Sequence, residues 1–186
     1  MIFDKHNFKK ILSRHSKQKI NNKNLIKAAV LIPVYNLDGK YYLLFTKRTE
    51  MVETHKGDVS FPGGIFHEED KSLLDTALRE TNEEIGISPE DVEILGELDD
   101  IDTSTNFIIS PFVGIVPFPY EYKISEMEIE RLIHVPLEFL LKEENFREEL
   151  WNHNGKNHKI YFYRHEGDII WGATGKIVKN FLDLLK

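Results

Sequence analysis

A helix that must end close to residue 86 constrains this chain more than any other feature of its sequence. Segment 72–85 has helical periodicity, and Gly86 stands where a left-handed residue commonly follows a helix. The apolar stripe of this segment comprises Leu74, Leu78, Thr81 and Ile85. The pattern therefore predicts an amphipathic helix over 72–85 whose apolar stripe packs against the rest of the fold.

The last turns of this helix carry three glutamates where negative charge is least favourable. Glu80, Glu83 and Glu84 spread over about 100° of the helix surface, well round from the apolar stripe. The first and last of them form an i,i+4 pair of like charges, and all three approach the negative end of the helix dipole. Arg79, placed i,i+4 to Glu83, offsets part of this cost. Two interpretations are open: a solvated charged face, or a site for a divalent cation.

A pair of glycines upstream favours the cation. The stretch SFPGG, residues 60–64, places Gly63 and Gly64 where the backbone can approach a ligand closely, because neither carries a Cβ atom. A carbonyl oxygen there could join the glutamates around an ion, and oxygen ligands are those that Mg²⁺ or Mn²⁺ prefers. Local rules broken without local compensation are typical of functional sites. We therefore expect a Mg²⁺ or Mn²⁺ site where the loop meets the helix.

The other periodic segments mix strands and helices without a regular βαβ rhythm. Two apolar runs around Asn36–Gly39 predict a β-hairpin over 27–48. Further expected strands are a short one in 57–64, which ends in a Pro-Gly-Gly loop, one in 92–101, one in 107–118, and a second hairpin over 158–173. Further helices are expected at 4–14, after Pro136, and at 175–186. The mixture predicts an α+β or layered α/β fold rather than a doubly wound sheet.

Composition narrows the class of protein. The 186 residues, 41% of them hydrophobic, suffice for one well-packed domain. The absence of cysteine excludes disulfides and thiolate sites and fits a cytoplasmic location. A formal net charge of −7 argues against a general nucleic-acid binder. Apolar runs fall short of the roughly 18 to 20 residues of a membrane-spanning helix, and the N-terminus lacks a secretory signal. We expect neither nucleic acid nor membrane as a partner.

The loop and helix together resemble a known signature. The stretch GGIFHEEDKSLLDTALRETNEEIGI, residues 63–87, is similar to the Nudix box of hydrolases that cleave a nucleoside diphosphate linked to another moiety. The positions that match are Arg79, Glu80, Glu83, Glu84, Gly86 and Ile87. The first half departs, because Gly64 precedes the usual glycine position and Asp70 is one residue further from the arginine than is typical. The resemblance implies a Nudix-type α/β/α sandwich with a mixed central sheet and short hairpins. The chain has no internal repeat and no Pro/Gly/Ser-rich linker, so we expect one domain over 1–186, with a helical extension at 1–27 and the box at about 64–87.

The segment before the box resembles one subfamily. LLFTKRTEMVETHKGDVSFPGG, residues 43–64, is similar to the upstream motif of the coenzyme A diphosphatases, which also carry the longer box with an aspartate. The matching positions are Thr46, Arg48, His55, Gly57, Val59, Phe61, Pro62, Gly63 and Gly64. Asp58 stands where this subfamily usually has a longer polar residue. The resemblance implies hydrolysis of coenzyme A, or a derivative of it, to 3′,5′-ADP and 4′-phosphopantetheine or its acyl form.

The resemblance also assigns roles to the residues of the box. Glu80 and Glu84 are the first expected ligands of Mg²⁺ or Mn²⁺, followed by Glu83 and the carbonyl of Gly63. Such a cation neutralises diphosphate charge and makes bound water nucleophilic near neutral pH. Arg79 is expected to orient a glutamate rather than to contact substrate.

Outside the helix, a further carboxylate is expected from a later loop, as base or extra ligand. Glu128 is the first candidate, Glu126 and Glu130 are competitors, and a solvated charged face is the alternative. Arg48, His55 and Gly64 are expected at the substrate, since arginine suits bidentate phosphate contacts.

Two other functions are open. One is a Nudix diphosphatase that acts on ADP-ribose or another nucleoside diphosphate derivative, since the box is common to all of these enzymes. The other is a non-catalytic domain that senses a nucleotide, although such domains usually have damaged boxes and all the core glutamates are intact here. The expected partner in each case is a small molecule, and a homodimer is compatible with the sequence.

Overall fold

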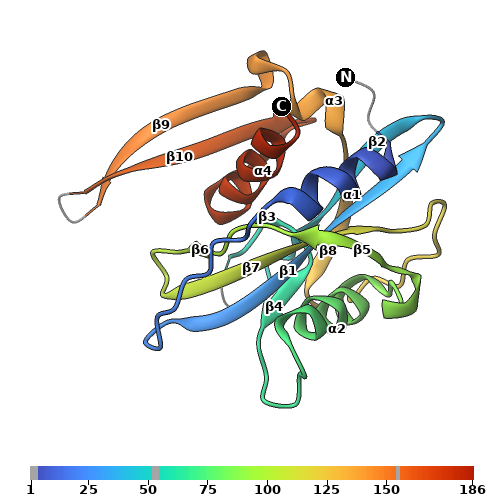
Figure 1. Cartoon of the computed structure of the whole chain (residues 1–186), viewed down its shortest axis with the longest axis horizontal. Helices are drawn as coiled ribbons and strands as arrows, with labels where there is room; N and C mark the ends of the chain where they lie inside the picture. The colour runs from blue at the N-terminus through green and yellow to red at the C-terminus, as the bar shows by residue number, and fades with distance from the viewer. Residues whose placement is uncertain (1–3, 52–54, 154–155) are drawn as a thin grey trace.

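The computed structural model describes residues 4–51, 55–153 and 156–186, which fold around an eight-stranded sheet (Figure 1). Its strands are β1 (Ile26–Leu37), β2 (Lys40–Arg48), β3 (Val59–Ser60), β4 (Gly63–Ile65), β5 (Glu93–Glu97), β6 (Ile101–Asp102), β7 (Phe107–Ile115) and β8 (Ile129–Pro136). They follow the order β3-β2-β1-β7-β5, with β4 also paired to β1, β6 to β7 and β8 to β2. The β1–β7 pair is parallel and the others are antiparallel, which confirms the predicted mixed sheet.

Helices cover both faces of this sheet (Figure 1). They are α1 (Lys5–Arg14), α2 (Leu73–Ile85), α3 (Leu137–Leu140) and α4 (Gly172–Leu184), with 3₁₀ turns η1 (Pro89–Asp91) and η2 (Glu143–Asn145). One cluster of buried side chains joins α1 and α4 to one face of the sheet, and a second cluster joins α2 to the opposite face. The predicted α/β/α sandwich is therefore confirmed.

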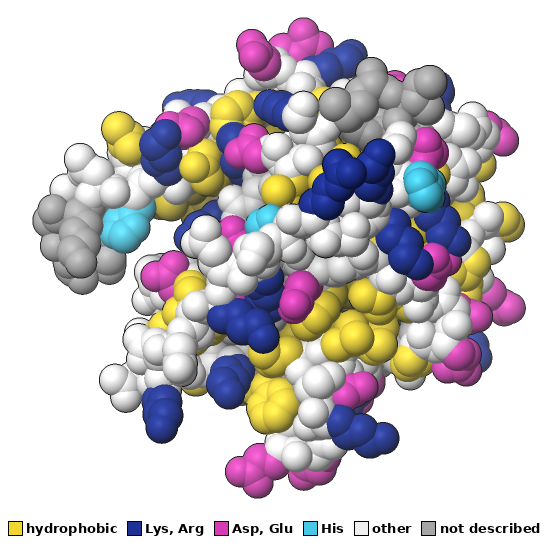
Figure 2. Space-filling view, in the orientation of Figure 1, with side chains coloured by type: hydrophobic (Ala, Val, Ile, Leu, Met, Phe, Trp, Pro, Cys, Tyr) yellow, Lys and Arg dark blue, Asp and Glu magenta, His cyan; other side chains and the backbone are white. Residues whose placement is uncertain are grey.

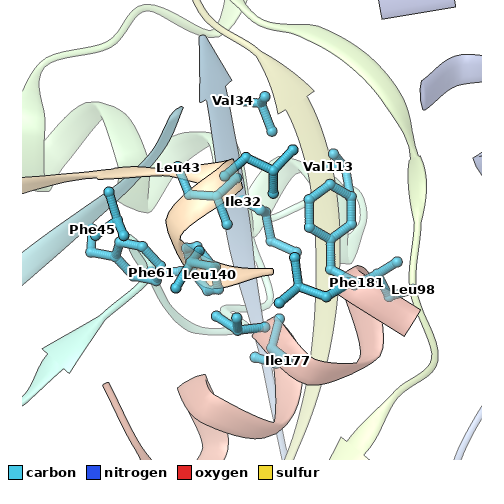
Figure 3. Close-up of a cluster of buried hydrophobic side chains, with 14 of the residues drawn as sticks. Ile32, Val34, Leu43, Phe45, Phe61, Leu98, Val113, Leu140, Ile177 and Phe181 are labelled. Atoms are coloured by element: carbon cyan, nitrogen blue, oxygen red, sulfur yellow. The ribbon is translucent and has the colours of Figure 1, made fainter. Parts of the chain in front are cut away.

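The two clusters meet at β1, where the alternation of a strand sends neighbouring side chains to opposite faces. Leu31 and Tyr35 belong to the cluster under α2, whereas Ile32 and Val34 belong to the cluster under α1 and α4. Figure 3 shows Ile32 and Val34 among the side chains of the larger cluster, to which Phe181 of α4 also belongs. Because both faces of β1 are buried, this strand reads as a nearly continuous apolar run.

A second, three-stranded sheet lies beside the first. It comprises β9 (Phe146–His153), β10 (Lys156–His165) and β11 (Asp168–Ile170), all antiparallel. The β9–β10 hairpin extends away from the central sheet (Figure 1), while α4 packs against β10. The hairpin predicted over 158–173 is confirmed as β10 and β11, but β9 was not predicted.

The predicted hairpin over 27–48 is confirmed as β1 and β2. Leu37 pairs with Lys40, so the turn contains Asp38 and Gly39, and both have positive φ, 51° and 81°. Positive φ at both central residues is the geometry that matches the right-handed twist of two paired strands. The predicted helices at the N-terminus, after Pro136 and at the C-terminus are confirmed as α1, α3 and α4.

Two local predictions are wrong, and one strand of the central sheet was not predicted. The Pro-Gly-Gly segment is not a loop, because Gly63 and Gly64 form β4 and pair with Val30 and Ala29 of β1. Residues 129–136 form β8, which was not predicted. The strands expected over 92–101 and 107–118 are shorter: the first is divided into β5 and β6, and the second ends at Ile115.

The surface in the view of Figure 2 mixes charges of both signs, with Lys and Arg side chains interspersed among Asp and Glu side chains. This distribution accords with the modest net negative charge of the chain. Among the described residues, no helix combines the length and the apolar character needed to cross a membrane.

Candidate active site

The glycine pair and the acidic helix of the sequence lie side by side in the structure as β4 and α2 (Figure 1). The helix begins after Ser72, whose hydroxyl accepts a hydrogen bond from the N–H of Asp75 at 3.2 Å. It ends at Gly86, which has the left-handed conformation that the sequence predicts. Because α2 packs against both β1 and β4, its C-terminal turns lie next to the two glycines.

Glu84 lies on the buried side of α2. Its exposed fraction is 3%, its Oε2 accepts a hydrogen bond from the N–H of Gly63 at 3.3 Å, and its Oε1 lies 3.7 Å from Nη1 of Arg48. Burial raises the pKa of Glu84 to about 8, and the negative charges of Glu80 and Glu128 act in the same direction, against the opposing charge of Arg48. The fold therefore buries Glu84 where the neighbouring positive charge and hydrogen bond do not fully stabilise its ionised form.

This position differs from the predicted helix face. The buried residues of α2 are Thr76, Ala77, Thr81, Glu84 and Ile85, whereas Leu74 and Leu78 are only half-buried. The prediction that all three glutamates lie away from the packed face of the helix is therefore wrong, because Glu84 is part of that face. The predicted stripe contains the buried residues Thr81 and Ile85 but omits Ala77 and Glu84. The small side chains of Ala77 and Thr81 allow α2 to approach the sheet closely.

Arg79 holds three carboxylates in place. Its guanidinium donates to both oxygens of Asp70, at 2.9 and 3.1 Å, to Oε1 of Glu80 at 2.9 Å and to Oε2 of Glu83 at 3.0 Å. A further bond runs to the carbonyl of Ile65 at 3.2 Å. This arrangement fixes the orientation of the two glutamates, which is the task that the resemblance implies for the arginine.

Asp70 is the part of this network to which the sequence assigned no role. The hydrogen bonds from Arg79 hold the pKa of Asp70 well below its usual range. Thr76 donates to the same carboxylate at 2.8 Å and the N–H of His67 at 3.0 Å, so Asp70 anchors the loop before α2 to the helix. The sequence signal for Asp70 was that it fills the acidic position of the box, although it lies one residue further from Arg79 than is usual.

Gly64 leaves the space that Glu80 occupies. A Cβ atom at residue 64 would stand 2.5 Å from Oε1 and 2.6 Å from Oε2 of Glu80, closer than nonbonded atoms allow. Gly63 is equally constrained, since it has φ of 155° and a Cβ atom there would lie 2.6 Å from Cα of Val30. Burial raises the pKa of Glu80, although Arg79 opposes the shift.

Replacing Gly64 by Ala tests the catalytic role that the resemblance implies for Glu80. In that role kcat is expected to fall by about a hundredfold, because displacement of a catalytic group by about 1 Å costs that much. Steady-state hydrolysis by the pure variant measures the loss. The matched comparison is Gly64→Ala in a Glu80→Ala background, where the methyl group has no carboxylate to displace. An equal additional loss in that background would contradict the assignment of the effect to Glu80.

Glu128 reaches the same region from the turn before β8. The N–H of Ser125 donates to the carbonyl of Glu84 at 2.9 Å, and the N–H of Thr49 donates to the carbonyl of Glu128 at 2.9 Å. These bonds tie segment 125–128 to the end of α2 on one side and to the end of β2 on the other. The charge of Glu128 is one of those that raise the pKa of Glu84, which places its carboxylate within electrostatic reach of the site.

His55 lies apart from this network, in the segment between β2 and β3. Its side chain is 56% exposed, and Nδ1 lies 3.0 Å from Oδ2 of Asp58. The structure thus brings Arg48 to Glu84 and places His55 against Asp58. Whether a substrate reaches His55 stays a prediction of the sequence.

The oxygen donors of the site suit a hard divalent cation. Glu80 and Glu84 are shielded carboxylates whose pKa values are raised, so a positive charge beside them would stabilise their ionised forms. Within the described part of the chain, no three His, Asp or Glu side chains already converge as ligands. The glutamate oxygens instead face Arg79, Arg48 and the N–H of Gly63, and a cation would take over part of these contacts.

Known proteins are similar to this chain in sequence and in fold. The family described as NUDIX domain matches residues 25–150. The chain is 34% identical over 151 residues to an "Uncharacterized Nudix hydrolase NudL" of Photorhabdus laumondii, covering 81% of this chain and 80% of the relative. A relative of the same description from Yersinia enterocolitica is 37% identical over 153 residues, with coverages of 82% and 78%.

Two solved structures show the same fold at low identity. A MutT/nudix family protein from Enterococcus faecalis has a TM-score of 0.54 and 15% identity, covering 100% of this chain and 76% of that one. A C. elegans Ap4A hydrolase in a binary complex has a TM-score of 0.52 and 21% identity, with coverages of 61% and 82%. With the family match, the relatives and the arrangement of α2 against its glycine pair, the chain belongs to the Nudix hydrolase family.

Proposed function

We propose that the protein is a metal-dependent diphosphatase that cleaves the diphosphate of coenzyme A or a derivative of it. The products are 3′,5′-ADP and 4′-phosphopantetheine or its acyl form. The observation that carries the proposal is the 3.7 Å approach of Arg48 to Glu84. Arg48 belongs to the upstream motif that resembles the coenzyme A diphosphatases, and Glu84 belongs to the box. The motif that suggests the substrate therefore meets the residues that suggest the chemistry.

In this proposal Glu80, Glu84, Glu83 and the carbonyl of Gly63 hold Mg²⁺ or Mn²⁺. When bound, the cation neutralises diphosphate charge and makes water nucleophilic near neutral pH. Arg79 orients two of the glutamates through the hydrogen bonds described above.

Arg48, Glu128 and Gly64 are the residues that contact the substrate or transfer a proton in this proposal. Arg48 binds phosphate through its charged N–H groups, which present a fork that suits phosphate oxygens. Glu128, exposed in the turn before β8, accepts a proton as base or supplies an additional oxygen. Gly64 carries no Cβ atom, and the carboxylate of Glu80 occupies the space beside its backbone, so the diphosphate meets this carboxylate rather than a side chain of residue 64.

The test incubates the pure protein with Mg²⁺ or Mn²⁺ and coenzyme A, alongside ADP-ribose, NADH, 8-oxo-dGTP and Ap4A. Chromatography with mass detection identifies the products. Release of 3′,5′-ADP faster than any other cleavage is the expected result. Faster cleavage of another member of the panel would retain the diphosphatase and reject coenzyme A as the preferred substrate. Binding of a nucleotide without any cleavage would favour the sensor.

Replacing Arg48 by Ala is expected to raise KM for coenzyme A by about 10- to 100-fold, because a hydrogen bond to a charged group is lost. Initial rates over a range of coenzyme A concentrations measure the change. Arg147→Ala is a matched control, since that arginine is 66% exposed on β9 and pairs with Glu149 outside the site. An Arg48→Ala variant with unchanged KM and kcat would remove the residue from the substrate site.

A further inference from the structure

Asp168 is a buried carboxylate that none of the roles above uses. It is 5% exposed at the first position of β11, directly after the turn that follows β10. Its Oδ1 accepts a hydrogen bond from Nζ of Lys47 at 3.1 Å, and its Oδ2 accepts one from Nη2 of Arg131 at 2.6 Å. Burial acts to raise the pKa of Asp168, but the bonds from the two cations outweigh it and lower that pKa. One carboxylate is thus shared between two cations.

These cations stand on two strands of the central sheet. Lys47 and Arg131 face each other across the β2–β8 pair. Directly beyond them the register shifts, and Glu130 becomes an extra residue of β8. Such a β-bulge bends its strand and changes the direction of the side chains that follow, and bulges are common next to active sites. Asp168 therefore clamps both strands at their last regular pair before the bulge.

The residues beyond the bulge belong to the candidate active site. Neighbouring side chains of a strand point to opposite faces, so Lys47 meets Asp168 on one face while Arg48 meets Glu84 on the other. The next residue, Thr49, donates its N–H to the carbonyl of Glu128. The course of β2 after the bulge thus determines where two of the site residues lie.

We propose that Asp168 is a positioning residue, which fixes the bulge between β2 and β8 and thereby the placement of Arg48 beside the glutamates. Without its carboxylate, Lys47 and Arg131 would face each other as like charges, with Glu130, 3.8 Å from Nε of Arg131, left to offset the arginine alone. Like charges directly opposite each other disfavour the pairing of the two strands at this point. A residue of the second sheet therefore takes part in aligning the site. The inference rests on the proposed function only in that Arg48 is taken to bind phosphate.

The test replaces Asp168 by Asn, which keeps the size of the side chain and removes its charge. The matched control is Asp100→Asn, because the side chain of Asp100 is 7% exposed and lies 2.9 Å from Nζ of Lys17, in the connection between β5 and β6. The first readout is amide hydrogen exchange at Arg48 and Thr49, measured by NMR. Asp168→Asn should accelerate exchange there by about tenfold, and Asp100→Asn should leave it as in the wild type.

The second readout is a double-mutant cycle with Arg48→Ala. If Asp168 acts through Arg48, Asp168→Asn should raise KM about tenfold in the wild type and scarcely at all when Arg48 is already absent, since coupled sites are not additive. Equal increases in both backgrounds would overturn the proposal, because a general loss of structure does not depend on Arg48. Equal exchange in Asp168→Asn and the wild type would also overturn it.

A second variant and a readout that needs no substrate complete the experiment. If Asp168→Asn does not fold, Lys47→Met removes one of the two cations and should accelerate exchange at the same amides by a smaller factor. Unchanged exchange in Lys47→Met would then overturn the proposal. If the wild type cleaves no diphosphate, the proposed function fails, while the exchange experiment still decides whether Asp168 fixes the bulge.

Discussion

Replacing Glu84 by Gln is expected to lower kcat for diphosphate hydrolysis by at least about a hundredfold, while the protein keeps its fold. Gln has nearly the same shape, so it can retain the contact with the N–H of Gly63. It cannot supply the negative charge that holds a divalent cation, and loss of one transition-state stabilising group costs about 10²- to 10³-fold. Steady-state rates at saturating Mg²⁺ or Mn²⁺ measure the effect, and circular dichroism checks the fold.

The control for this experiment is Glu138→Gln, an exposed glutamate on α3. It should hydrolyse substrate at the wild-type rate. Wild-type turnover by Glu84→Gln would remove this residue from the catalytic machinery and with it the assignment of the cation to α2. The Glu84→Gln variant therefore tests cation binding itself rather than a residue that positions the cation ligands.

Features set by neighbouring residues could be predicted from the sequence. The β1–β2 hairpin follows from two apolar runs with Asp38 and Gly39 between them, and both residues tolerate the positive φ that the turn requires. The C-terminus of α2 follows from Gly86 in the same way. In both cases the decisive interaction lies within a few residues of the chain.

The strands that were missed lack that local signal. In β8 the extra residue Glu130 interrupts the alternation of buried and exposed positions, so the period of two that marks a strand is lost. In β9 the run of charges at 147–149 obscures the pattern, because this strand has a neighbour only on one side, β10. Pairing with a distant segment, rather than local preference, determines both strands.

The candidate site shows the same division. Unfavourable charge at the end of α2 was visible in the sequence and identified the glutamates. The burial of Glu84 was not visible, because it depends on how closely α2 approaches β4. Asp168 could not be connected with the site at all, since 121 positions separate it from Lys47 and only the packing of β11 brings them together.

The burial of Glu84 has a consequence for stability that can be measured without substrate. Its pKa is about 8 in the folded protein against an ordinary value of 4.5, so the folded state binds the proton more tightly than the unfolded chain. The contribution of this group to stability is fully present below pH 4.5 and is lost as the pH rises through about 8. The loss is on the order of a few kcal/mol of unfolding free energy.

In the absence of divalent cations, the unfolding free energy of Glu84→Gln should therefore decline less between pH 5 and 8.5 than that of the wild type. Urea denaturation at each pH measures this free energy. Glu138→Gln should keep the wild-type decline. Mg²⁺ or Mn²⁺ should restore stability to the wild type at the alkaline end, because a cation that binds ionised carboxylates of the folded state alone stabilises that state. The same cation should have a much smaller effect on Glu84→Gln. Equal pH profiles for the two proteins would show that Glu84 is not held against its charge, and then neither burial nor a cation would explain why a glutamate occupies this position.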